Sequence, residues 1–397
     1  MYRKIMRYLE AWKNSPHRKP LILQGARQVG KTYAVLEFGR THYDNVAYFN
    51  FETSPRLAQT FAEDISPDYL IPVLSHIAGQ TIVRERTLIV LDEVQLCERA
   101  LTSLKYFYED APEYHIIVAG SLLGVAVNRE AFSFPVGKVD MKTMYPMDME
   151  EFLLAVGEEA LAQRIRACFD TDTPLPAALH EAAMQRYRQY LTVGGMPECV
   201  LQYAQTQDQV LVRHTQDTIL AGYLNDMSKY NTQNEIKKTR LVYDNVTVQL
   251  SKKNTRFQYK LIKKGARAAE FENALEWLCL SGVISRVYRA EQVKKPLENY
   301  RDIDAFKVYV SDLGLLCAKK NLAAADILYM SEELNDFKGG MAENYAQTQL
   351  IANGYQTYYW ESDRGAEVDF VIQREGRLIP IEVKSADNTR AKSLKVY

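Results

Sequence analysis

The sequence lacks long hydrophobic runs. Among its 397 residues, no apolar stretch approaches the ~20 residues that a membrane-spanning helix requires. The first residues are charged and lead into no apolar signal core, so neither a membrane protein nor a secreted precursor is predicted. Cysteine is also scarce: the five cysteines are scattered, odd in number and without metal-ligand spacing. This pattern excludes a disulfide framework and predicts reduced thiols in a cytoplasmic protein.

An excess of charge of one sign is missing too, since the formal net charge is -1. The charges are nevertheless unevenly distributed along the chain. The stretch from Lys229 to Arg267 holds eleven Lys/Arg and two Asp/Glu. Such segregation indicates a basic face for nucleic acid. The alternative is an ordinary solvated surface on which these charges are dispersed once the chain folds.

One motif stands out among the residues that are present. It follows a short apolar run, Pro20 to Gln24, and it precedes a predicted helix. It matches the phosphate-binding pattern G-x-x-x-x-G-K-[ST] and consists of Gly25, Ala26, Arg27, Gln28, Val29, Gly30, Lys31 and Thr32. Glycines let such a loop point its N–H groups at phosphate, and the helix N-terminus adds positive charge. Lys31 is therefore predicted to bind the β- and γ-phosphates of ATP, and Thr32 to bind Mg²⁺.

A second motif is the apolar run from Thr87 to Leu91, which ends in Asp92 and Glu93. This is typical of a buried parallel strand that ends at a nucleotide site. Asp92 is predicted to hold Mg²⁺ together with Thr32, and Glu93 to polarise the attacking water as the catalytic base. The alternative is an ordinary strand end with two solvated acids.

Further strands are predicted at 45–51, 115–121 and, as an edge strand, 138–144. Ser121 ends one of them and could contact the γ-phosphate or the attacking water, or instead cap the next helix. Strands and helices alternate over about the first 150 residues, which predicts a parallel sheet covered by helices on both faces.

These motifs resemble a group of bacterial and archaeal AAA-class P-loop ATPases. The resemblance rests on residues 20–32, 91–95 and 120–123, and extends to Tyr145-Pro146-Met147, Glu151-Phe152-Leu153 and Gly194-Gly195-Met196-Pro197-Glu198. It implies an ATPase followed by a C-terminal restriction-endonuclease-like domain, in a family whose cellular role is largely unassigned. AAA-class ATPases often use an arginine finger, sometimes from a neighbouring subunit, so an oligomer is compatible with the sequence. Arg129 could be such a residue or a surface residue.

The middle of the chain predicts helices at 180–190, 209–223, 235–250 and 267–280. Two strands, 283–288 and 306–310, follow them. Helices followed by a two-stranded wing suggest a winged-helix module, and the basic stretch lies within it. Such a module could contact DNA or another protein, and Glu270, Glu272 and Glu276 on its last helix are unfavourable next to phosphates.

The C-terminal region predicts a helix opening at Gly339 and strands at 355–361, 366–372 and 378–384. Glu382 and Lys384 are two residues apart on a strand and should share one face. With Asp369 and Glu343 they could hold Mg²⁺ and orient water. This pattern resembles the PD-(D/E)xK nuclease core, a fold that often serves only for binding. The chain stops inside a predicted helix, 389–397, so we expect a truncated chain or a core without its last elements.

The sequence thus predicts an α/β protein in three parts: a P-loop ATPase domain with a parallel sheet (1–155), a helical lid and winged-helix-like region (156–325) and an α/β restriction-endonuclease-like domain (326–397). The predicted function is ATP hydrolysis with ATP and Mg²⁺, in a protein that acts on DNA. The alternative is an ATP-gated signalling or scaffold switch that contacts proteins and carries an inert nuclease-like domain.

Overall fold

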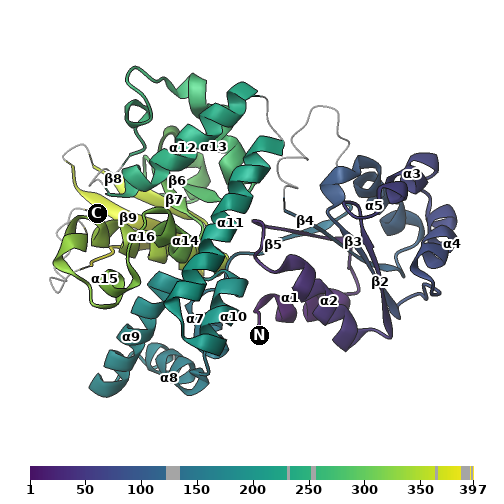
Figure 1. Ribbon diagram of the computed structural model, residues 1–397, viewed down its shortest axis with the longest axis horizontal. Coiled ribbons are helices and arrows are strands. Elements are labelled where there is room, and N and C mark those ends of the chain that lie inside the picture. Colours follow the sequence, from purple (N-terminus) through teal and green to yellow (C-terminus); the bar gives the residue numbers. More distant parts are fainter. Residues whose placement is uncertain (122–134, 230–232, 252–255, 363–364, 386–393, 395–396) are drawn as a thin grey trace. The chain divides into compact units, whose positions relative to one another are not determined.

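The computed structural model describes residues 1–397 except 122–134, 230–232, 252–255, 363–364, 386–393 and 395–396. The chain forms two compact units, Tyr2–Met144 and Tyr145–Tyr397. Figure 1 shows the elements of both. Within the part of the chain that is described, no helix is long and apolar enough to cross a membrane.

The first unit is built on a five-stranded sheet whose strand order is β2-β3-β4-β1-β5. All of its neighbouring strands are parallel, and β5 is an edge strand, as predicted. The strands are β1 (Leu21–Gln24), β2 (Asn45–Asn50), β3 (Thr87–Asp92), β4 (His115–Gly120) and β5 (Asp140–Thr143). Strands β3, β4 and β1 are adjacent and parallel. Their carboxyl ends therefore lie side by side at one end of the sheet.

Helices cover this sheet as the alternation of elements predicted. The helices are α1 (Ile5–Lys13), α2 (Lys31–His42), α3 (Pro55–Glu63), α4 (Pro67–Ala78) and α5 (Glu98–Asp110). Apolar side chains of α3, α4 and α5, such as Phe61, Leu74 and Leu104, form one buried core with Ile89 and Val118 of the sheet. On α2, a side chain at Gly39 would strike Val46 and Leu88, so this glycine lets the helix pack closely on the strands.

The second unit begins with helices and continues into a mixed sheet. Its helices are α7 (Met149–Ala155), α8 (Glu159–Asp170), α9 (Ala177–Val193), α10 (Pro197–Thr206), α11 (Gln209–Lys229), α12 (Gln233–Ser251), α13 (Ala268–Leu280), α14 (Leu313–Lys319), α15 (Ala324–Leu328) and α16 (Asn335–Ala352). The sheet has the order β10-β9-β8-β6-β7. Its strands are β6 (Ile284–Ala290), β7 (Arg301–Val310), β8 (Thr357–Glu361), β9 (Glu367–Arg374) and β10 (Arg377–Ile381).

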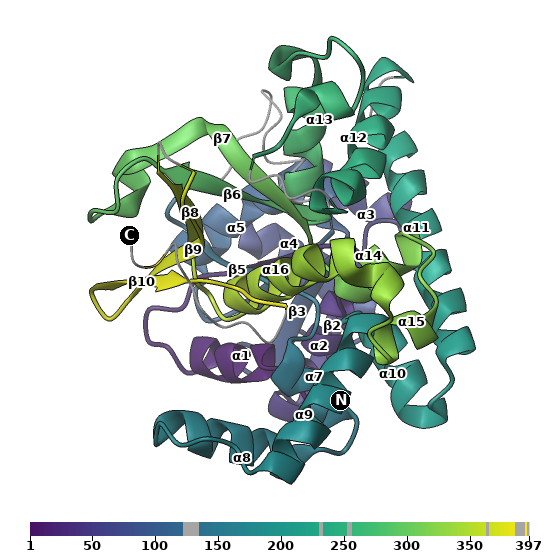
Figure 2. The same cartoon turned by 90° about the vertical axis from the view of Figure 1, so that its left-hand side faces the viewer.

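Helix α16 lies against this sheet, as Figure 2 shows. Ala346 and Leu350 of the helix pack against a core of Tyr309, Tyr359 and Phe370. Glu343 precedes Ala346 by three residues and therefore lies on the same side of α16. The helix thus directs a carboxylate toward the sheet.

Two of the segments on which the resemblance rests, 145–147 and 194–198, meet inside the second unit. The N–H of Met147 donates to the carbonyl of Gly195 over 2.6 Å, and a Cβ on Gly195 would lie 2.1 Å from the Met147 carbonyl oxygen. Buried Asp312 accepts hydrogen bonds from the N–H groups of Gly195 (2.6 Å) and Leu315 (2.8 Å), and so caps α14. These segments therefore join α7, α9 and α14.

The structure corrects three details of the sequence prediction. The two strands expected as a wing, β6 and β7, are part of the second sheet, because β6 pairs in parallel with β8. Strand β10 ends at Ile381, so Glu382 and Lys384 follow the strand instead of lying within it. Helix α16 begins at Asn335, before Gly339. The helix predicted at 389–397 falls largely outside the described residues.

Candidate functional site

The predicted phosphate loop connects β1 to α2 and has the backbone that such a loop needs. Gly30 has a φ of 88° and immediately precedes α2, and Gln28 has a φ of 64°. At Gly25, where φ is 146°, a Cβ would lie 2.1 Å from the Met144 carbonyl oxygen. Only glycine fits at position 25, because both the conformation and the close backbone approach exclude a side chain. The loop is therefore shaped by its own sequence and by β5.

Lys31 is buried at the first position of α2. Its ammonium donates hydrogen bonds to the carbonyl oxygens of Gly25 (2.9 Å) and Ala26 (2.8 Å) within the loop. Burial lowers the pKa of Lys31 to about 8, against the opposing effect of Glu93 and Asp92. The ammonium thus lies inside the loop, where the phosphates of a nucleotide would meet it.

Thr32 and Asp92 meet directly, although they come from different elements. The Thr32 hydroxyl donates a 2.8 Å hydrogen bond to Asp92 Oδ2. The same carboxylate oxygen accepts a 2.9 Å hydrogen bond from the Tyr48 hydroxyl on β2. Asp92 is 3% exposed at the end of β3. Two oxygen ligands suited to Mg²⁺ are therefore held side by side next to the loop.

Glu93 follows β3 in a left-handed conformation, with a φ of 52°. Its N–H donates to Asp92 Oδ1 over 2.9 Å, and its carboxylate accepts a hydrogen bond from the Gln95 amide. Burial is the largest of the effects that raise the pKa of Glu93, and the neighbouring Asp92 adds to it. A raised pKa makes the carboxylate a stronger proton acceptor, as a general base requires.

The remaining predicted residues of the first unit are placed as follows. Ala26 and Val29 are buried in the loop, and the Val29 carbonyl accepts a 2.8 Å hydrogen bond from Arg3. Arg27 is half-buried. Ser121 is buried directly after β4, the strand between β1 and β3. Arg129 lies outside the described residues.

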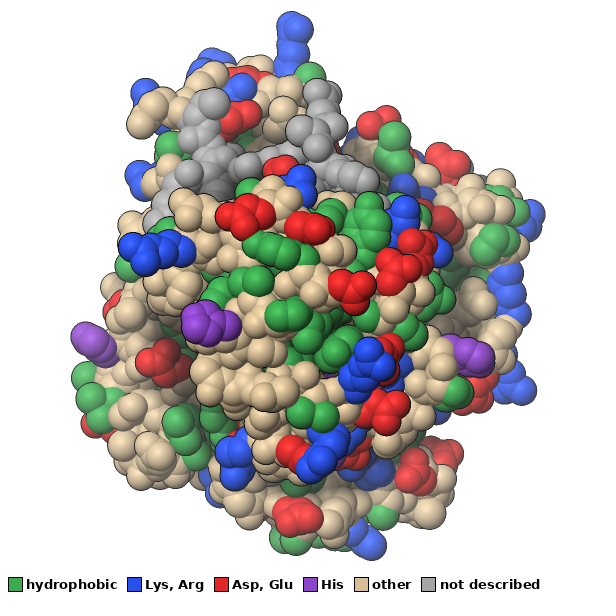
Figure 3. Space-filling model, turned by 90° about the vertical axis from the view of Figure 1, so that its right-hand side faces the viewer, with side chains coloured by type: hydrophobic (Ala, Val, Ile, Leu, Met, Phe, Trp, Pro, Cys, Tyr) green, Lys and Arg blue, Asp and Glu red, His purple; other side chains and the backbone are tan. Residues whose placement is uncertain are grey.

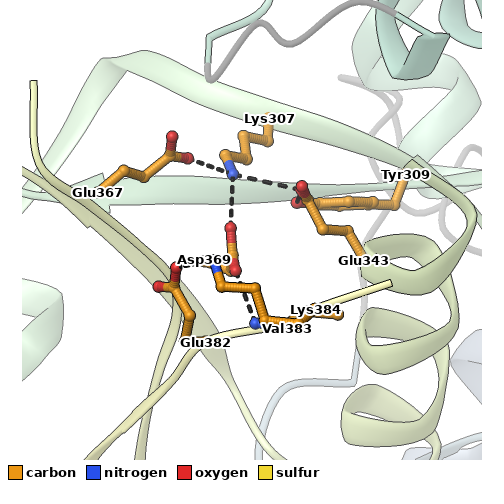
Figure 4. Close-up of polar contacts among 8 residues, drawn as sticks. All are labelled: Lys307, Tyr309, Glu343, Glu367, Asp369, Glu382, Val383 and Lys384. Atoms are coloured by element: carbon orange, nitrogen blue, oxygen red, sulfur yellow. Dashed lines mark hydrogen bonds and ion pairs between the residues drawn. The ribbon is translucent and has the colours of Figure 1, made fainter. Parts of the chain in front are cut away.

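The predicted C-terminal residues lie around a group that the sequence analysis did not include, Lys307 of β7. Figure 4 shows the Lys307 ammonium between Glu367 and Glu343, with Asp369 below it. The ammonium is 3.4 Å from Glu343 Oε2 and 3.9 Å from Asp369 Oδ1, and it is also ion-paired with Glu367. We call Lys307, Glu343, Glu367 and Asp369 the acidic cluster.

The acidic cluster combines buried Lys307 with three partly buried carboxylates, and further hydrogen bonds hold it in place. Tyr309 donates a 3.1 Å hydrogen bond to Glu343, and the Val383 N–H donates a 2.7 Å bond to Asp369 Oδ2. Burial, then the charge of Glu343, raise the pKa of Asp369 to about 7. Burial alone would lower the pKa of Lys307, but Tyr309, Glu343 and Glu367 hold it well above its ordinary value.

Glu382 and Lys384 do not join this cluster as predicted. They form an ion pair with each other. The other carboxylate oxygen of Glu382, Oε2, is buried and has no hydrogen-bond partner among the described residues. The structure therefore brings Glu343 and Asp369 together around Lys307, while Lys384 pairs with Glu382.

The cluster fits a nuclease metal poorly. A divalent cation among Glu343, Glu367 and Asp369 would face the positive Lys307 ammonium at short range. One oxygen of Asp369 is also committed to the Val383 N–H. Within the described part of the chain, no group of three or more His, Cys, Asp or Glu side chains is arranged to hold a metal ion.

Comparison with known protein families matches a model described as an AAA domain to residues 17–153. Residues 17–153 form an AAA domain. The resemblance to AAA-class P-loop ATPases is thereby confirmed for this part of the chain. Two further models, both described as domains of unknown function, match residues 184–326 (DUF8612) and 338–397 (DUF4143). No curated protein matches the sequence.

Several solved structures are similar to the chain at low identity. The Walker-type ATPase PABY2304 of Pyrococcus abyssi has a TM-score of 0.48 and 15% identity, with 79% of this chain and 94% of that chain covered. The Aeropyrum pernix ORC2 protein, in ADPNP–ADP complexes, has a TM-score of 0.36 and 10% identity over 83% and 95% of the two chains. The Thermotoga maritima RuvB Holliday junction branch migration motor has a TM-score of 0.33 and 14% identity over 72% and 88%.

Sequence analysis missed several residues around both sites. In the AAA domain these are Tyr48 and Gln95, which hold Asp92 and Glu93. In the C-terminal region they are Lys307 and Glu367. Two signals could have indicated the latter pair: Lys307 is a lone charge in the apolar run Phe306 to Val310, and Glu367 precedes Asp369 by two residues, which is the spacing of one strand face.

Proposed function

We propose that the protein is an ATPase that binds ATP at the phosphate loop of its AAA domain and hydrolyses it. The observation that carries the proposal is the hydrogen bond from Thr32 to Asp92, beside buried Lys31 and partly buried Glu93. An ordinary glycine turn followed by a solvated strand end would not bring these four side chains together. Their residue types are those that phosphoryl transfer uses.

The residues present fit Mg²⁺-ATP. The loop admits only glycine at position 25, which supports a close approach of backbone to phosphate. Thr32 and Asp92 would hold Mg²⁺ through oxygen atoms that are already adjacent. When bound, Mg²⁺ would neutralise charge on the β- and γ-phosphates.

The chain's own groups have distinct tasks in this proposal. The Lys31 ammonium exchanges its bonds to the Gly25 and Ala26 carbonyls for bonds to phosphate oxygens. Glu93 orients a water molecule and accepts its proton, and the Gln95 amide keeps the carboxylate in place. Ser121, at the end of the strand between the two motifs, is a further polar group for the γ-phosphate or this water.

The test is ATP turnover by the full chain and by Lys31→Ala. The variant removes the phosphate-facing charge and should abolish hydrolysis and weaken ATP binding. Arg40→Ala is the matched control, because Arg40 is an exposed cation on the same helix that pairs with Glu37. Hydrolysis by Lys31→Ala at the wild-type rate would refute the proposal, provided that Arg40→Ala is also unchanged.

We propose DNA as the partner on which ATP hydrolysis acts. The support is the part of the basic stretch that lies between α12 and α13, where the described cations are exposed. They are Arg256, Lys260, Lys263, Lys264 and Arg267. On the face of the molecule seen in Figure 3, Lys/Arg and Asp/Glu side chains are interspersed instead. The cations between Arg256 and Arg267 instead form a concentrated run, as phosphate binding requires.

The second candidate is an ATP-gated switch that contacts a protein. It is favoured by the carboxylates of α13: Glu272 pairs with Arg286 and accepts a hydrogen bond from Tyr259, next to the basic stretch. Exposed Glu270 adds further negative charge. In either case an oligomer could supply an arginine to the nucleotide site of a neighbouring subunit.

A further inference from the structure

The acidic cluster in the C-terminal sheet, whose carboxylates are partly buried, holds its own cation. Lys307 extends from β7, Glu343 from α16, and Glu367 and Asp369 from β9. These three elements are distant in sequence, yet all three carboxylates lie around one ammonium (Figure 4). Lys307 is 7% exposed, and its ammonium also lies 5.3 Å from the centre of the Tyr359 ring.

A lysine buried in this way requires partners, and the carboxylates equally require a cation. Isolated charges are costly to bury, so buried ions are paired or bound to metals. Here the cation that faces the three carboxylates is the lysine itself. The ammonium approaches Glu343, Glu367 and Asp369, and Tyr309 and the Val383 N–H supply further hydrogen bonds.

We propose that the Lys307 ammonium takes the place of a divalent metal in this nuclease-like site, so that the acidic cluster is a structural ion-pair centre. The region then acts through its surface and does not cleave phosphodiesters. Lys384 supports this assignment, because it is ion-paired with Glu382 and supplies no free lysine to the cluster. The inference is independent of the proposed ATPase activity.

The test measures Mn²⁺ binding to the nucleotide-free, chelator-treated full chain. Free Mn²⁺ is counted by electron paramagnetic resonance, and the thermal unfolding midpoint is recorded with and without Mn²⁺. Any binding near Thr32 and Asp92 is common to all variants, so only differences between variants are used. The variants are Lys307→Met, which has a similar length without charge, and Lys384→Met, a matched control outside the cluster.

Lys307→Met should lower the midpoint by several degrees in chelator, because it leaves three partly buried carboxylates without their cation. It should bind one Mn²⁺ more than the wild type, and Mn²⁺ should restore part of the lost midpoint. Adding Asp369→Asn to Lys307→Met should abolish this gain. Lys384→Met should bind no additional Mn²⁺. A folded Lys307→Met that gains no Mn²⁺ would overturn the proposal.

A second arm does not depend on the folding of Lys307→Met. Asp369→Asn is made in the chain that retains Lys307, and its Mn²⁺ binding is compared with that of the wild type. If Lys307 replaces the metal, the two bind the same amount. If the wild type binds a Mn²⁺ that Asp369→Asn loses, a metal shares the cluster with the lysine and the inference is wrong.

Discussion

The Thr32 hydroxyl and Asp92 Oδ2 are 2.8 Å apart, although 60 residues separate them in the chain. Thr32 is in the first turn of α2 and Asp92 ends β3, so the contact depends on the strand order that inserts β4 between β1 and β3. The hydrogen bond places the phosphate-loop motif next to the acidic motif at the end of β3.

The roles of the two acids next to this contact can be separated by mutation. Glu93→Gln retains size and hydrogen bonding but removes the base, so ATP should still bind while turnover falls by ~10²-fold or more. Asp92→Asn should instead weaken Mg²⁺-dependent ATP binding. Binding and single-turnover hydrolysis are measured for each. Exposed Glu98→Gln, at the start of α5, is the control, and equal loss of binding in both variants would contradict these roles.

Paired lysines test the proposed DNA contact. Lys263→Glu with Lys264→Glu reverses two exposed charges in the basic stretch, and Lys294→Glu with Lys295→Glu reverses two exposed charges elsewhere. The first pair should weaken DNA binding for all sequences alike and reduce the slope of log K against log salt by ~0.9 for each lost phosphate contact. Equal affinities for the two double variants and the wild type would favour the protein-contacting switch.

Asp312 predicts a pH dependence of stability. Burial raises the pKa of its carboxyl from 3.8 to about 6, even though backbone N–H groups oppose the shift. Because the folded-state value is the higher one, the stabilising contribution is complete below pH 3.8 and is lost as the pH rises through about 6. The lost contribution corresponds to roughly 3 kcal/mol.

Asp312→Asn should therefore flatten the dependence of the unfolding free energy on pH between about 4 and 7, although it destabilises the chain at every pH by losing an acceptor. Urea unfolding at several pH values measures this slope. The control is Asp208→Asn, since Asp208 is exposed and caps a local turn. An unchanged slope in Asp312→Asn would show that another group is responsible.

Two glycines predict opposite effects of the same substitution. Gly195→Ala would force a methyl group to within 2.1 Å of the Met147 carbonyl oxygen, so we expect a loss of ~1–3 kcal/mol in unfolding free energy. Gly222 lies within α11 and has open space around it, so Gly222→Ala should stabilise by ~0.5–1 kcal/mol. Denaturant unfolding compares the two, and a stable Gly195→Ala would contradict the close contact.

The features that could be predicted from the sequence are those that depend on a local residue pattern, namely the buried strands and the phosphate loop. Apolar runs at 20–24, 87–92 and 115–120 are strands because their residues are buried on both faces, and the phosphate loop has a motif that is specific in itself. Alternation also indicates which side chains of a strand share a face. It does not reveal which strand lies alongside, because that is determined by contacts between distant segments.

The acidic cluster illustrates this limit. Lys307 reaches Asp369 only because β6 and β7 share a sheet with β8 and β9, and β6 meets β8 at Tyr288 and Arg289, opposite Tyr358 and Tyr359. No nearby sequence feature predicts that pairing. The same is true of the end of β10 at Ile381, which leaves Glu382 and Lys384 free to pair with each other.

The shared sheet has an evolutionary consequence. Strands β6 and β7 fall in the segment matched at 184–326, and β8 to β10 fall in the segment matched at 338–397. A recombination event between the two segments would leave the β6 edge without its β8 neighbour and Lys307 without Glu367 and Asp369. We therefore expect either segment, expressed alone, to form an incomplete and aggregation-prone sheet.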